Sequence, residues 1–402
     1  MHALVLGAGV VGVTTAYYLA DAGCDVTVID RAPEVAAGAS HANGGQLSYS
    51  FTDSLAKPAF IAKIPGLVLG QDRAAKVRLS TELVRWGLRF LPECRRQRST
   101  ANTLALLEMA MRSARLLEAL RDRHSIDFAH RAAGKLVLLP TAADLREAER
   151  NTLLKRRHGS DVELLSRSEV CELEPALGQL RDPFAGAVYS RSDEVADTRA
   201  FVEGLGRTLS ASGRVQFRLG ETVERLDRNA NGRIGVVVDG EALRADAIVV
   251  CLGAWSERLL GGAGVAAHIY PVRGYSLTLP PGEAAPNVSV TSLRNRIVFS
   301  RINGYLRIAG FADFAGFDTS RDGERVATLL DVARRAAPAM ADYEAADPGA
   351  WGGFRPMTPN GRPLVGATKV PGLFVNTGHG MLGWTLACAS AHDAAIAVTG
   401  SA

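Results

Sequence analysis

The sequence contains few cysteines, and none of them lie close together. Five occur in 402 residues, at Cys24, Cys94, Cys171, Cys251 and Cys388, and no two form a CxxC pair. Zinc and iron–sulfur centres need clustered thiolate ligands, so this scatter argues against both, and we expect no metal site. An odd, scattered set also argues against a disulfide framework and for a reducing, cytoplasmic location.

The chain also lacks a strong excess of one charge. Lys and Arg number 46 against 42 Asp and Glu, which leaves a net charge of +4. The densest basic stretch, residues 95–98, has no interleaved aromatic residues, so a solvated helix end explains it better than a nucleic-acid groove. We therefore expect no nucleic-acid partner.

Long apolar runs are rare, and two apolar stretches bear on membrane association. Residues 1–20 hold no Asp, Glu, Lys or Arg, but no basic segment precedes the apolar stretch, so a signal peptide is not indicated. Residues 61–70 are apolar but short, and Pro65 interrupts them, so they cannot span a bilayer. With Lys57 and Lys63 nearby they suit the surface of a membrane; the alternative is a loop packed against its own protein.

The first 30 residues predict a strand, a glycine turn, a helix and a second strand. Gly7, Gly9 and Gly12 have dinucleotide-fingerprint spacing, and Asp30 ends the second strand. Gly7 permits a tight turn, Gly9 lets the backbone approach a pyrophosphate, and Gly12 brings helix and strand together. Asp30 suits the hydroxyls of a ribose, while the helix N-terminus faces the phosphates. Dinucleotide binding is favoured over a chance glycine turn.

Two further glycine-rich segments favour FAD over NAD. Residues 38–45 are small and polar, so their backbone N–H groups are expected to reach the flavin-side phosphate; a plain surface loop is the alternative. Residues 378–383 form a turn that opens a helix over about 383–398, which must dock on something formed earlier in the chain. The N-terminus of this helix would stabilise the negative charge of a reduced flavin near N1 and the C2 carbonyl. An NAD enzyme has no need of this return of the chain.

The rest of the chain predicts an α/β protein of two interleaved domains. Residues 86–120 read as one long helical region with a Leu/Met core stripe, and residues 198–253 as a second nucleotide-domain stretch. Alternating residues in 268–309 fit an antiparallel sheet covered on one face. We predict a discontinuous Rossmann-like FAD-binding domain and a discontinuous α+β substrate domain that carries the antiparallel sheet. The predicted boundaries are 1–55, 192–262 and 352–402 for the first, and 56–191 and 263–351 for the second.

Three segments resemble a known family closely. Residues 270–279 (YPVRGYSLTL), 354–366 (FRPMTPNGRPLVG) and 376–388 (NTGHGMLGWTLAC) resemble the bacterial D-amino-acid dehydrogenases of the small-subunit type. These are flavoproteins of the D-amino-acid oxidase/glycine oxidase superfamily. The likeness extends over nearly the whole chain. Two segments depart from the family pattern, residues 48–51 and residues 192–197.

The resemblance implies an enzyme with noncovalent FAD that deaminates D-amino acids oxidatively. The Cα hydrogen would leave as hydride to flavin N5, and the imine would hydrolyse to a 2-oxo acid and ammonia. Electrons would pass to a quinone or another acceptor, which is compatible with peripheral contact on the cytoplasmic face of the inner membrane. The alternatives are a related enzyme of glycine, sarcosine or D-hydroxyproline, and a non-catalytic flavin-binding sensor or subunit.

Candidate site residues follow from these motifs together. Arg355 is the expected anchor, because a guanidinium binds a carboxylate through two parallel hydrogen bonds. Tyr275 and Tyr49 are weaker candidates for substrate contact, with an ordinary strand tyrosine as the alternative for Tyr275. For Arg273 and Arg301 a solvated strand face is favoured, and contact with a second acidic group of the substrate is the alternative. The predicted cofactor-binding set is Gly7, Gly9, Val10, Val11, Gly12, Asp30, Arg31, Ser40, Asn43, Gly44, Gly45, Val223, Gly253, Gly378, His379, Gly380, Met381, Leu382 and Gly383.

Overall fold

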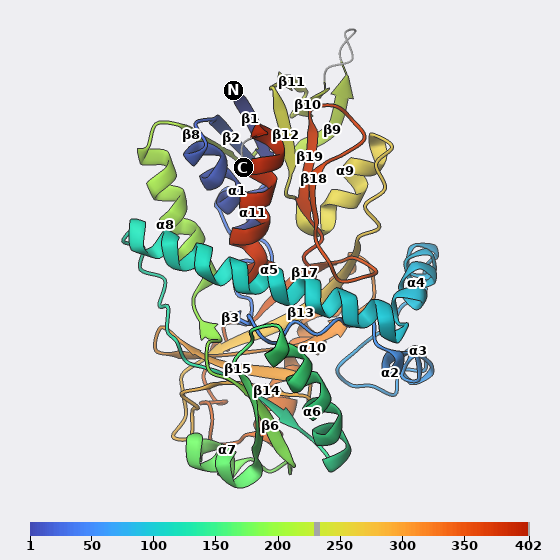
Figure 1. Cartoon of the computed structure of the whole chain (residues 1–402), viewed down its shortest axis with the longest axis vertical. Helices are drawn as coiled ribbons and strands as arrows, with labels where there is room; N and C mark the ends of the chain where they lie inside the picture. Colours follow the sequence, from blue (N-terminus) through green and yellow to red (C-terminus); the bar gives the residue numbers. More distant parts are fainter. Residues whose placement is uncertain (229–233, 401–402) are drawn as a thin grey trace.

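Two large sheets lie one above the other in the computed structural model, which describes residues 1–228 and 234–400. A six-stranded sheet forms one end of the molecule and an eight-stranded sheet the other, and the long helix α5 (Arg96–Arg123) crosses between them (Figure 1). Each sheet has its own hydrophobic core. The predicted α/β class, with a Rossmann-like half, is confirmed.

The six-stranded sheet has the order β18-β19-β12-β1-β2-β8. All neighbours pair in parallel except β18 and β19. The central strands β1 and β12 are nearly continuous apolar runs, as expected where a sheet is covered on both faces. They are β1 (His2–Leu6), β2 (Asp25–Asp30), β8 (Val215–Leu219), β12 (Ala247–Val250), β18 (Leu364–Ala367) and β19 (Leu373–Thr377). Strands predicted over residues 3–6, 25–30 and 215–219 are confirmed.

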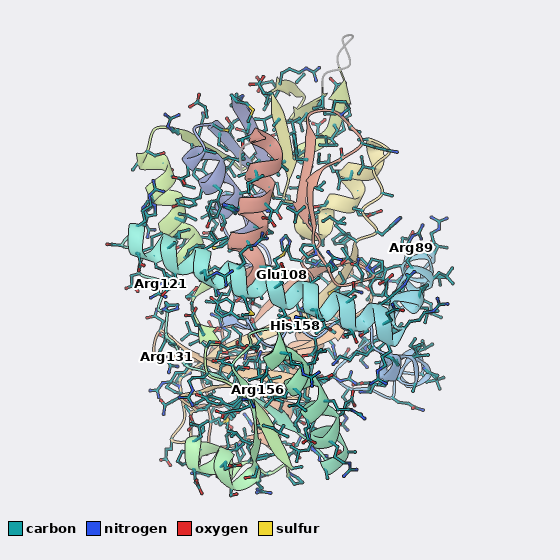
Figure 2. All side chains as sticks on the ribbon, viewed as in Figure 1. Arg89, Glu108, Arg121, Arg131, Arg156 and His158 are labelled. Atoms are coloured by element: carbon teal, nitrogen blue, oxygen red, sulfur yellow. The ribbon has the colours of Figure 1, made fainter. Side chains whose placement is uncertain are left out.

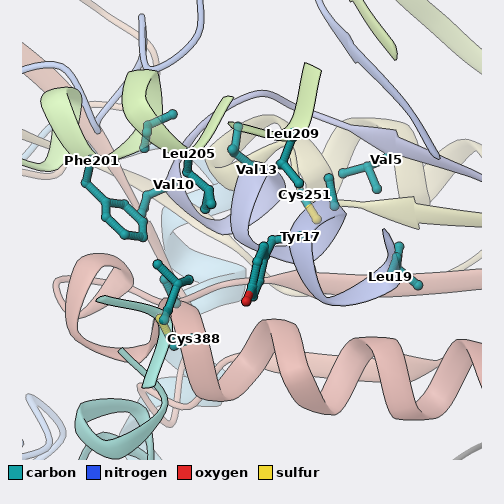
Figure 3. Close-up of a cluster of buried hydrophobic side chains, with 14 of the residues drawn as sticks. Val5, Val10, Val13, Tyr17, Leu19, Phe201, Leu205, Leu209, Cys251 and Cys388 are labelled. Carbon is teal, nitrogen blue, oxygen red and sulfur yellow. The ribbon is translucent and has the colours of Figure 1, made fainter. Parts of the chain in front are cut away.

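Helices cover one face of this sheet, and a small sheet covers the other. On the first face α1 (Val10–Asp21), α8 (Thr198–Ala211) and α11 (Gly383–Thr399) enclose the core drawn in Figure 3, where Val13 and Tyr17 of α1 lie with Phe201 of α8 and Cys388 of α11. The predicted final helix thus docks on the first one. The second face is covered by β9 (Val223–Arg228), β10 (Ile234–Val238), β11 (Glu241–Arg244) and α9 (Ser256–Gly262).

The eight-stranded sheet has the order β17-β13-β16-β15-β14-β4-β6-β5. It is antiparallel except between β14 and β4. Its strands are β4 (Lys135–Leu139), β5 (Val162–Ser166), β6 (Gly186–Ser190), β13 (Tyr270–Leu279), β14 (Ser289–Ser292), β15 (Ile297–Ile302), β16 (Tyr305–Asp313) and β17 (Trp351–Met357).

Strand β13 corrects the expectation of a sheet covered on one face only. Nine of its ten residues are buried, and Thr278 is the exception. Helix α10 (Asp322–Ala336) covers one face, where Tyr275 packs with Leu329. On the other face the chain around residue 42 crosses the strand, because Ser276 Oγ donates to the Ala42 carbonyl at 2.5 Å. The alternation of residues along β13 therefore reflects two buried faces that pack against different elements.

The predicted helical region over residues 86–120 is two helices. Helix α4 (Thr81–Glu93) contains Pro92 in its last turn, and α5 begins after Arg95, whose extended backbone breaks the path. Pro92 cannot donate a backbone hydrogen bond, so the helix ends just after it. Two short helices, α2 (Pro58–Ile61) and α3 (Ile64–Val68), lie beside α4. Within the described residues no helix combines the length and hydropathy needed to cross a membrane.

Among the described residues, the remaining elements are a short two-stranded sheet, two helices and two 3-10 turns. Strands β3 (Gln46–Leu47) and β7 (Glu194–Val195) pair antiparallel. The others are α6 (Ala142–Arg157), α7 (Arg167–Leu173) and the 3-10 turns at Pro175–Gln179 and Gly253–Trp255. The predicted domain boundaries stay a prediction, although β17, which begins at the boundary placed at 352, pairs with β13 in the larger sheet.

Candidate functional site

The fingerprint glycines lie where the backbone leaves no space for a side chain. Gly7 has φ of +110°, and a Cβ there would stand 2.6 Å from the Cys251 carbonyl oxygen. A Cβ on Gly12 would overlap the carbonyl oxygen of Gly7. Gly9 precedes α1, which has no capping side chain of its own and no acidic residue in its first turn. The free N–H groups of Val11 and Gly12 therefore suit a pyrophosphate, so this cradle fits a dinucleotide such as FAD.

Asp30 lies beside the fingerprint, as predicted. Its carboxylate accepts hydrogen bonds from the backbone N–H of Ala8 at 2.7 Å and of Ala32 at 2.9 Å. Both oxygens keep further lone pairs, so the aligned carboxylate can still accept from ribose hydroxyls. The chain near Val223 lies close by, since the Glu221 N–H donates to the Asp30 carbonyl at 3.0 Å.

Arg31 stacks on an aromatic ring that the sequence reasoning missed. Its guanidinium carbon lies 4.3 Å from the ring centroid of Trp255. Trp255 belongs to the 3-10 turn that starts at Gly253, directly after β12. A cation stacked on an indole offers a flat surface beside Asp30, and only the Gly253 turn in the sequence hinted at it.

The small residues at 38–45 connect the two sheets, and we call them the bridging segment. Ser40 Oγ accepts from the Val10 N–H at 3.0 Å, which ties the segment to the start of α1. At the other end Asn43 Oδ1 accepts from the Gly45 N–H at 2.9 Å. Gly44 lies against Val298 of the larger sheet, where a Cβ would approach to 3.2 Å. Residues predicted to contact the cofactor thus run from the fingerprint onto the eight-stranded sheet.

The turn before α11 is held against β17. Gly378 and Gly380 have φ of +80° and +56°, a region that favours glycine. The Gly380 N–H donates to the Pro356 carbonyl at 2.9 Å, so the turn and the strand that carries Arg355 are neighbours. Met381 is exposed, Leu382 precedes the helix, and Gly383 is its first residue.

His379 is buried in this turn and hydrogen-bonded to α11. Its Nε2 lies 2.8 Å from Ser390 Oγ, and burial lowers its pKa to about 3. The imidazole is therefore neutral at ordinary pH. It suits a structural contact or a contact with a flavin edge better than proton transfer.

The pKa of His379 makes stability depend on pH. The unfolded imidazole has a pKa of about 6.5, so below that pH the unfolded chain binds more protons than the folded one, and stability falls as pH falls. His379→Gln keeps a partner for Ser390 but cannot be charged. We expect its loss of Tm between about pH 7.5 and about pH 5.5 to be smaller than that of the wild type by roughly 1–3 °C. The matched control is His158→Gln at an exposed position, and equal losses in all three proteins would contradict the argument.

Arg355 lies on the face of β17 that meets the bridging segment. It pairs in register with Val272, and its guanidinium lies over Gly274, where a Cβ would overlap it. Its Nη1 donates to the Phe311 carbonyl at 2.6 Å. Burial lowers the pKa of Arg355, with Asp313 acting in the opposite direction. Among the described residues it forms no ion pair, so this half-buried cation lacks a carboxylate partner.

The structure does not bring Tyr275 to the side of the sheet on which Arg355 lies. The register puts Tyr275 on the opposite face, and its hydroxyl donates to Asp313 Oδ2 at 3.0 Å. Asp313 also accepts two bonds from Arg325 at 2.8 and 2.9 Å. Burial raises the pKa of Tyr275. The network is a buried structural one, which matches the ordinary strand tyrosine that was the alternative.

Tyr49 and the two atypical segments meet in one buried cluster. The Tyr49 hydroxyl donates to Glu194 Oε2 at 2.8 Å, and the Ser50 N–H donates to Asp193 Oδ1 at 3.0 Å. Segments 48–51 and 192–197, which both depart from the family pattern, are therefore direct neighbours. Lys135 extends the cluster by donating to Ser48 Oγ at 2.7 Å.

Lys135 is a functional candidate that the sequence reasoning missed. It is 2% exposed and also donates to Gln46 Oε1 at 3.0 Å. Burial lowers the pKa of Lys135 and raises that of Asp193. A lysine that opens an apolar strand carries no signal of burial in the sequence. Its ammonium fixes the stretch of chain that directly follows Gly45.

The predicted arginines on the strands differ in exposure. Arg301 is exposed, as expected of a solvated face. Arg273 is buried instead, and it forms an ion pair with Asp322 at the start of α10. The expectation of a solvated face was wrong for Arg273, because α10 covers that side of the sheet.

Comparison with known proteins gives one family over nearly the whole chain. The model described as "FAD dependent oxidoreductase" (DAO) matches residues 2–395. A protein of Ralstonia nicotianae named D-amino acid dehydrogenase 2 is 40% identical, with 97% of this chain and 95% of that protein covered. A D-amino acid dehydrogenase of Dechloromonas aromatica is 39% identical, with 100% and 97% covered.

Solved structures show the same fold. Glycine oxidase from Geobacillus kaustophilus superposes with a TM-score of 0.76 at 24% identity, covering 100% of this chain and 95% of that one. The L-proline dehydrogenase from P. horikoshii also gives 0.76, at 18% identity, with 99% and 93% covered. At these identities the likeness concerns the fold.

Proposed function

The chain belongs to the DAO family of FAD-dependent oxidoreductases, and from that premise we propose that it oxidises D-amino acids to 2-oxo acids and ammonia with noncovalently bound FAD. The observation that carries the proposal is Arg355, a half-buried guanidinium without a carboxylate partner among the described residues. It lies between the bridging segment and the turn before α11. A desolvated guanidinium that forms no ion pair in the described residues suits an anionic ligand.

In this proposal the residues of the chain bind and orient the cofactor and the substrate. When bound, FAD supplies the two-electron acceptor for the Cα hydrogen. Gly7, Gly9 and Gly12 would hold its pyrophosphate, Asp30 its ribose, and residues 378–383 its electron-rich end. Arg355 would hold the substrate carboxylate with two hydrogen bonds, while Phe311 fixes the plane of the guanidinium. Fixing the carboxylate sets which face of Cα meets the cofactor, and hence the D configuration.

No group of the chain needs to act as a strong base. The substrate reacts with its amine neutral, and the imine that follows hydrolyses in water. His379, with its pKa lowered to about 3, would stay neutral throughout. Tyr49 and Tyr275 have hydroxyl groups engaged with Glu194 and Asp313, so we assign substrate binding to Arg355 first.

Anaerobic bleaching of the flavin tests the proposal. The flavin absorbance at about 450 nm should fall when D-amino acids are added and stay constant when their L-enantiomers are added. A panel with glycine, sarcosine and D-hydroxyproline distinguishes the related amine enzymes. A purified protein that is colourless, and stays so after incubation with FAD, would contradict the whole assignment.

We further propose that the electrons pass to a membrane quinone, with α2–α4 resting on the membrane. Five apolar side chains on and beside α3 and α4 are 40–73% exposed, and we call this surface the apolar face. It consists of Val68, Leu69, Val84, Leu88 and Leu91. Arg85 and Arg89 are exposed on α4, and Figure 2 shows Arg89 at the edge of the molecule. Apolar side chains flanked by cations suit an anionic bilayer surface.

The buried side of α4 supports this location. Trp86 and Phe90 pack with Val272, which pairs with Arg355. The Trp86 indole N–H donates to the Met357 carbonyl at 2.9 Å. A single helix therefore separates the apolar face from the strand that carries Arg355, and this short separation supports the proposal of an acceptor in the membrane.

Binding to vesicles tests the membrane contact. The double variant L69E/L88E should bind vesicles of anionic phospholipid at least about fivefold more weakly than the wild type, because it puts two charges on the apolar face. Its rate with a soluble electron acceptor should be unchanged. The control is L153E/L173E, which changes two exposed leucines elsewhere. Equal vesicle binding by both variants would contradict the location.

A further inference from the structure

Beside Arg355 the surface of the larger sheet is formed by two glycines and therefore carries no side chains; we call it the glycine floor. Gly274 of β13 and Gly353 of β17 are partners in register, on the same face as Arg355. The Arg355 guanidinium lies over Gly274, where a Cβ would overlap it. Ala39 of the bridging segment closes over Gly353, with its Cα 3.2 Å from where a Cβ would stand. The two glycines thus let a cation and the bridging segment approach the sheet side by side.

Trp351 extends over this floor from the start of β17. Trp351, Gly353 and Arg355 alternate along the strand, so they share a face. The indole nitrogen Nε1 lies 3.7 Å from the position of a Cβ on Gly353. The ring therefore leans along the strand toward Arg355, and a stack on His41 at 4.2 Å between centroids holds it there.

The indole N–H of Trp351 is buried without a hydrogen-bond partner in the part of the chain that the structure describes. A buried donor left unsatisfied costs free energy, and an unsatisfied donor in a native structure calls for an explanation. An indole can only donate, so it selects an acceptor oxygen. Opposite Cβ positions in an antiparallel pair are about 4.5–5.5 Å apart, so the guanidinium over Gly274 and the indole nitrogen near Gly353 are within reach of one small ligand.

We propose that Trp351 is a second substrate-binding residue, whose indole N–H donates to the carboxylate that Arg355 holds. The inference rests on the proposed function, because it takes the D-amino acid as the ligand. A carboxylate has about four acceptor positions, of which a bidentate arginine uses two. The indole N–H would occupy a third acceptor position. It would thereby fix the tilt of the carboxylate relative to the guanidinium plane, because the two coplanar hydrogen bonds from arginine define this tilt less well.

Trp351→Phe tests the proposal, since it keeps a stacking ring and removes only the N–H. We expect KM for D-alanine to rise about tenfold, with kcat changed less than about twofold, because one binding contact is lost. The dissociation constant of propionate, which lacks the amine and cannot react, should rise by the same factor when followed by the absorbance of the flavin. The affinity for FAD should not change.

Trp384→Phe is the matched control. Trp384 also has a buried indole N–H without a partner in the described residues, but it packs in the core of the six-stranded sheet against Phe201, at 4.7 Å between centroids. It should leave both constants unchanged.

The inference is overturned if Trp351→Phe leaves KM and the propionate constant as they are, or if Trp384→Phe raises them equally. Weaker FAD binding with unchanged KM would assign the N–H to the cofactor and would also overturn it. If D-amino acids fail to bleach the flavin, the proposed function fails, while the propionate titration still reports on Trp351.

Discussion

Replacing Arg355 by alanine is expected to lower kcat/KM for D-amino acids at least about 100-fold, or roughly 3 kcal/mol, with FAD still bound. The guanidinium lies on the face of β17 that meets the bridging segment, where it contacts the Phe311 carbonyl and lies over Gly274. Its removal would take away the two hydrogen bonds proposed to fix the carboxylate, so we expect both binding and orientation to suffer. Stopped-flow reduction of the flavin by D-alanine measures the effect.

The controls separate anchoring from charge and from folding. Arg355→Lys keeps the charge but cannot form a planar pair of bonds, so it should recover only part of the rate. Arg301→Ala removes an exposed arginine from β15 in the same sheet and should leave the rate unchanged. The flavin content of each protein shows that the fold is intact. A rate for Arg355→Ala equal to that of the wild type would remove Arg355 from the site.

Replacing Gly12 by alanine is expected to reduce the flavin content of the purified protein to below about a tenth of the wild-type value. The added methyl would overlap the carbonyl of Gly7, so helix α1 must move away from the turn that we propose holds the pyrophosphate. Overpacking of this kind costs about 1–3 kcal/mol, and here the strain falls on the binding cradle. The ratio of flavin absorbance to protein absorbance measures it.

Gly206 offers a matched control on another helix. It lies in α8, and a Cβ there would meet only Phe217 at 3.8 Å, an ordinary contact. Gly206→Ala should therefore keep its flavin and gain slightly in stability. A Gly12→Ala protein with full flavin content would mean that the turn adapts, and that its glycines are not required by the geometry.

Local sequence patterns predicted the nucleotide-binding half well. Residues 1–30 alternate between strand, turn and helix with clear signals, and Gly7, Gly12 and Asp30 lie where the motif requires. The end of α4 was missed because helix-favouring residues occur on both sides of Pro92. The two helices pack in different hydrophobic clusters, and periodicity alone does not show where one helix ends and the next begins.

The site itself depends on register, which a single sequence does not reveal. Arg355 and Tyr275 both lie in recognisable motifs, but only the pairing of β13 with β17 puts them on opposite faces. Lys135 and Trp351 belong to no motif, and their roles follow from burial and from partners distant in the chain. The role of Gly274 and Gly353 likewise becomes clear only from their pairing, which puts them side by side on the face that carries Arg355.

The sheet order of the nucleotide-binding half also dictates when it can form during synthesis. Strand β1 pairs with β12 as well as β2, and β12 pairs with β19, more than 350 positions along the chain from the end of β1. Such distant pairings give a high contact order and slow folding. The nascent chain leaves the ribosome with β1, β2 and α1 made but with one side of the sheet open. We therefore expect the glycine turn beside β12 to be completed late, and the binding of FAD to follow late in folding.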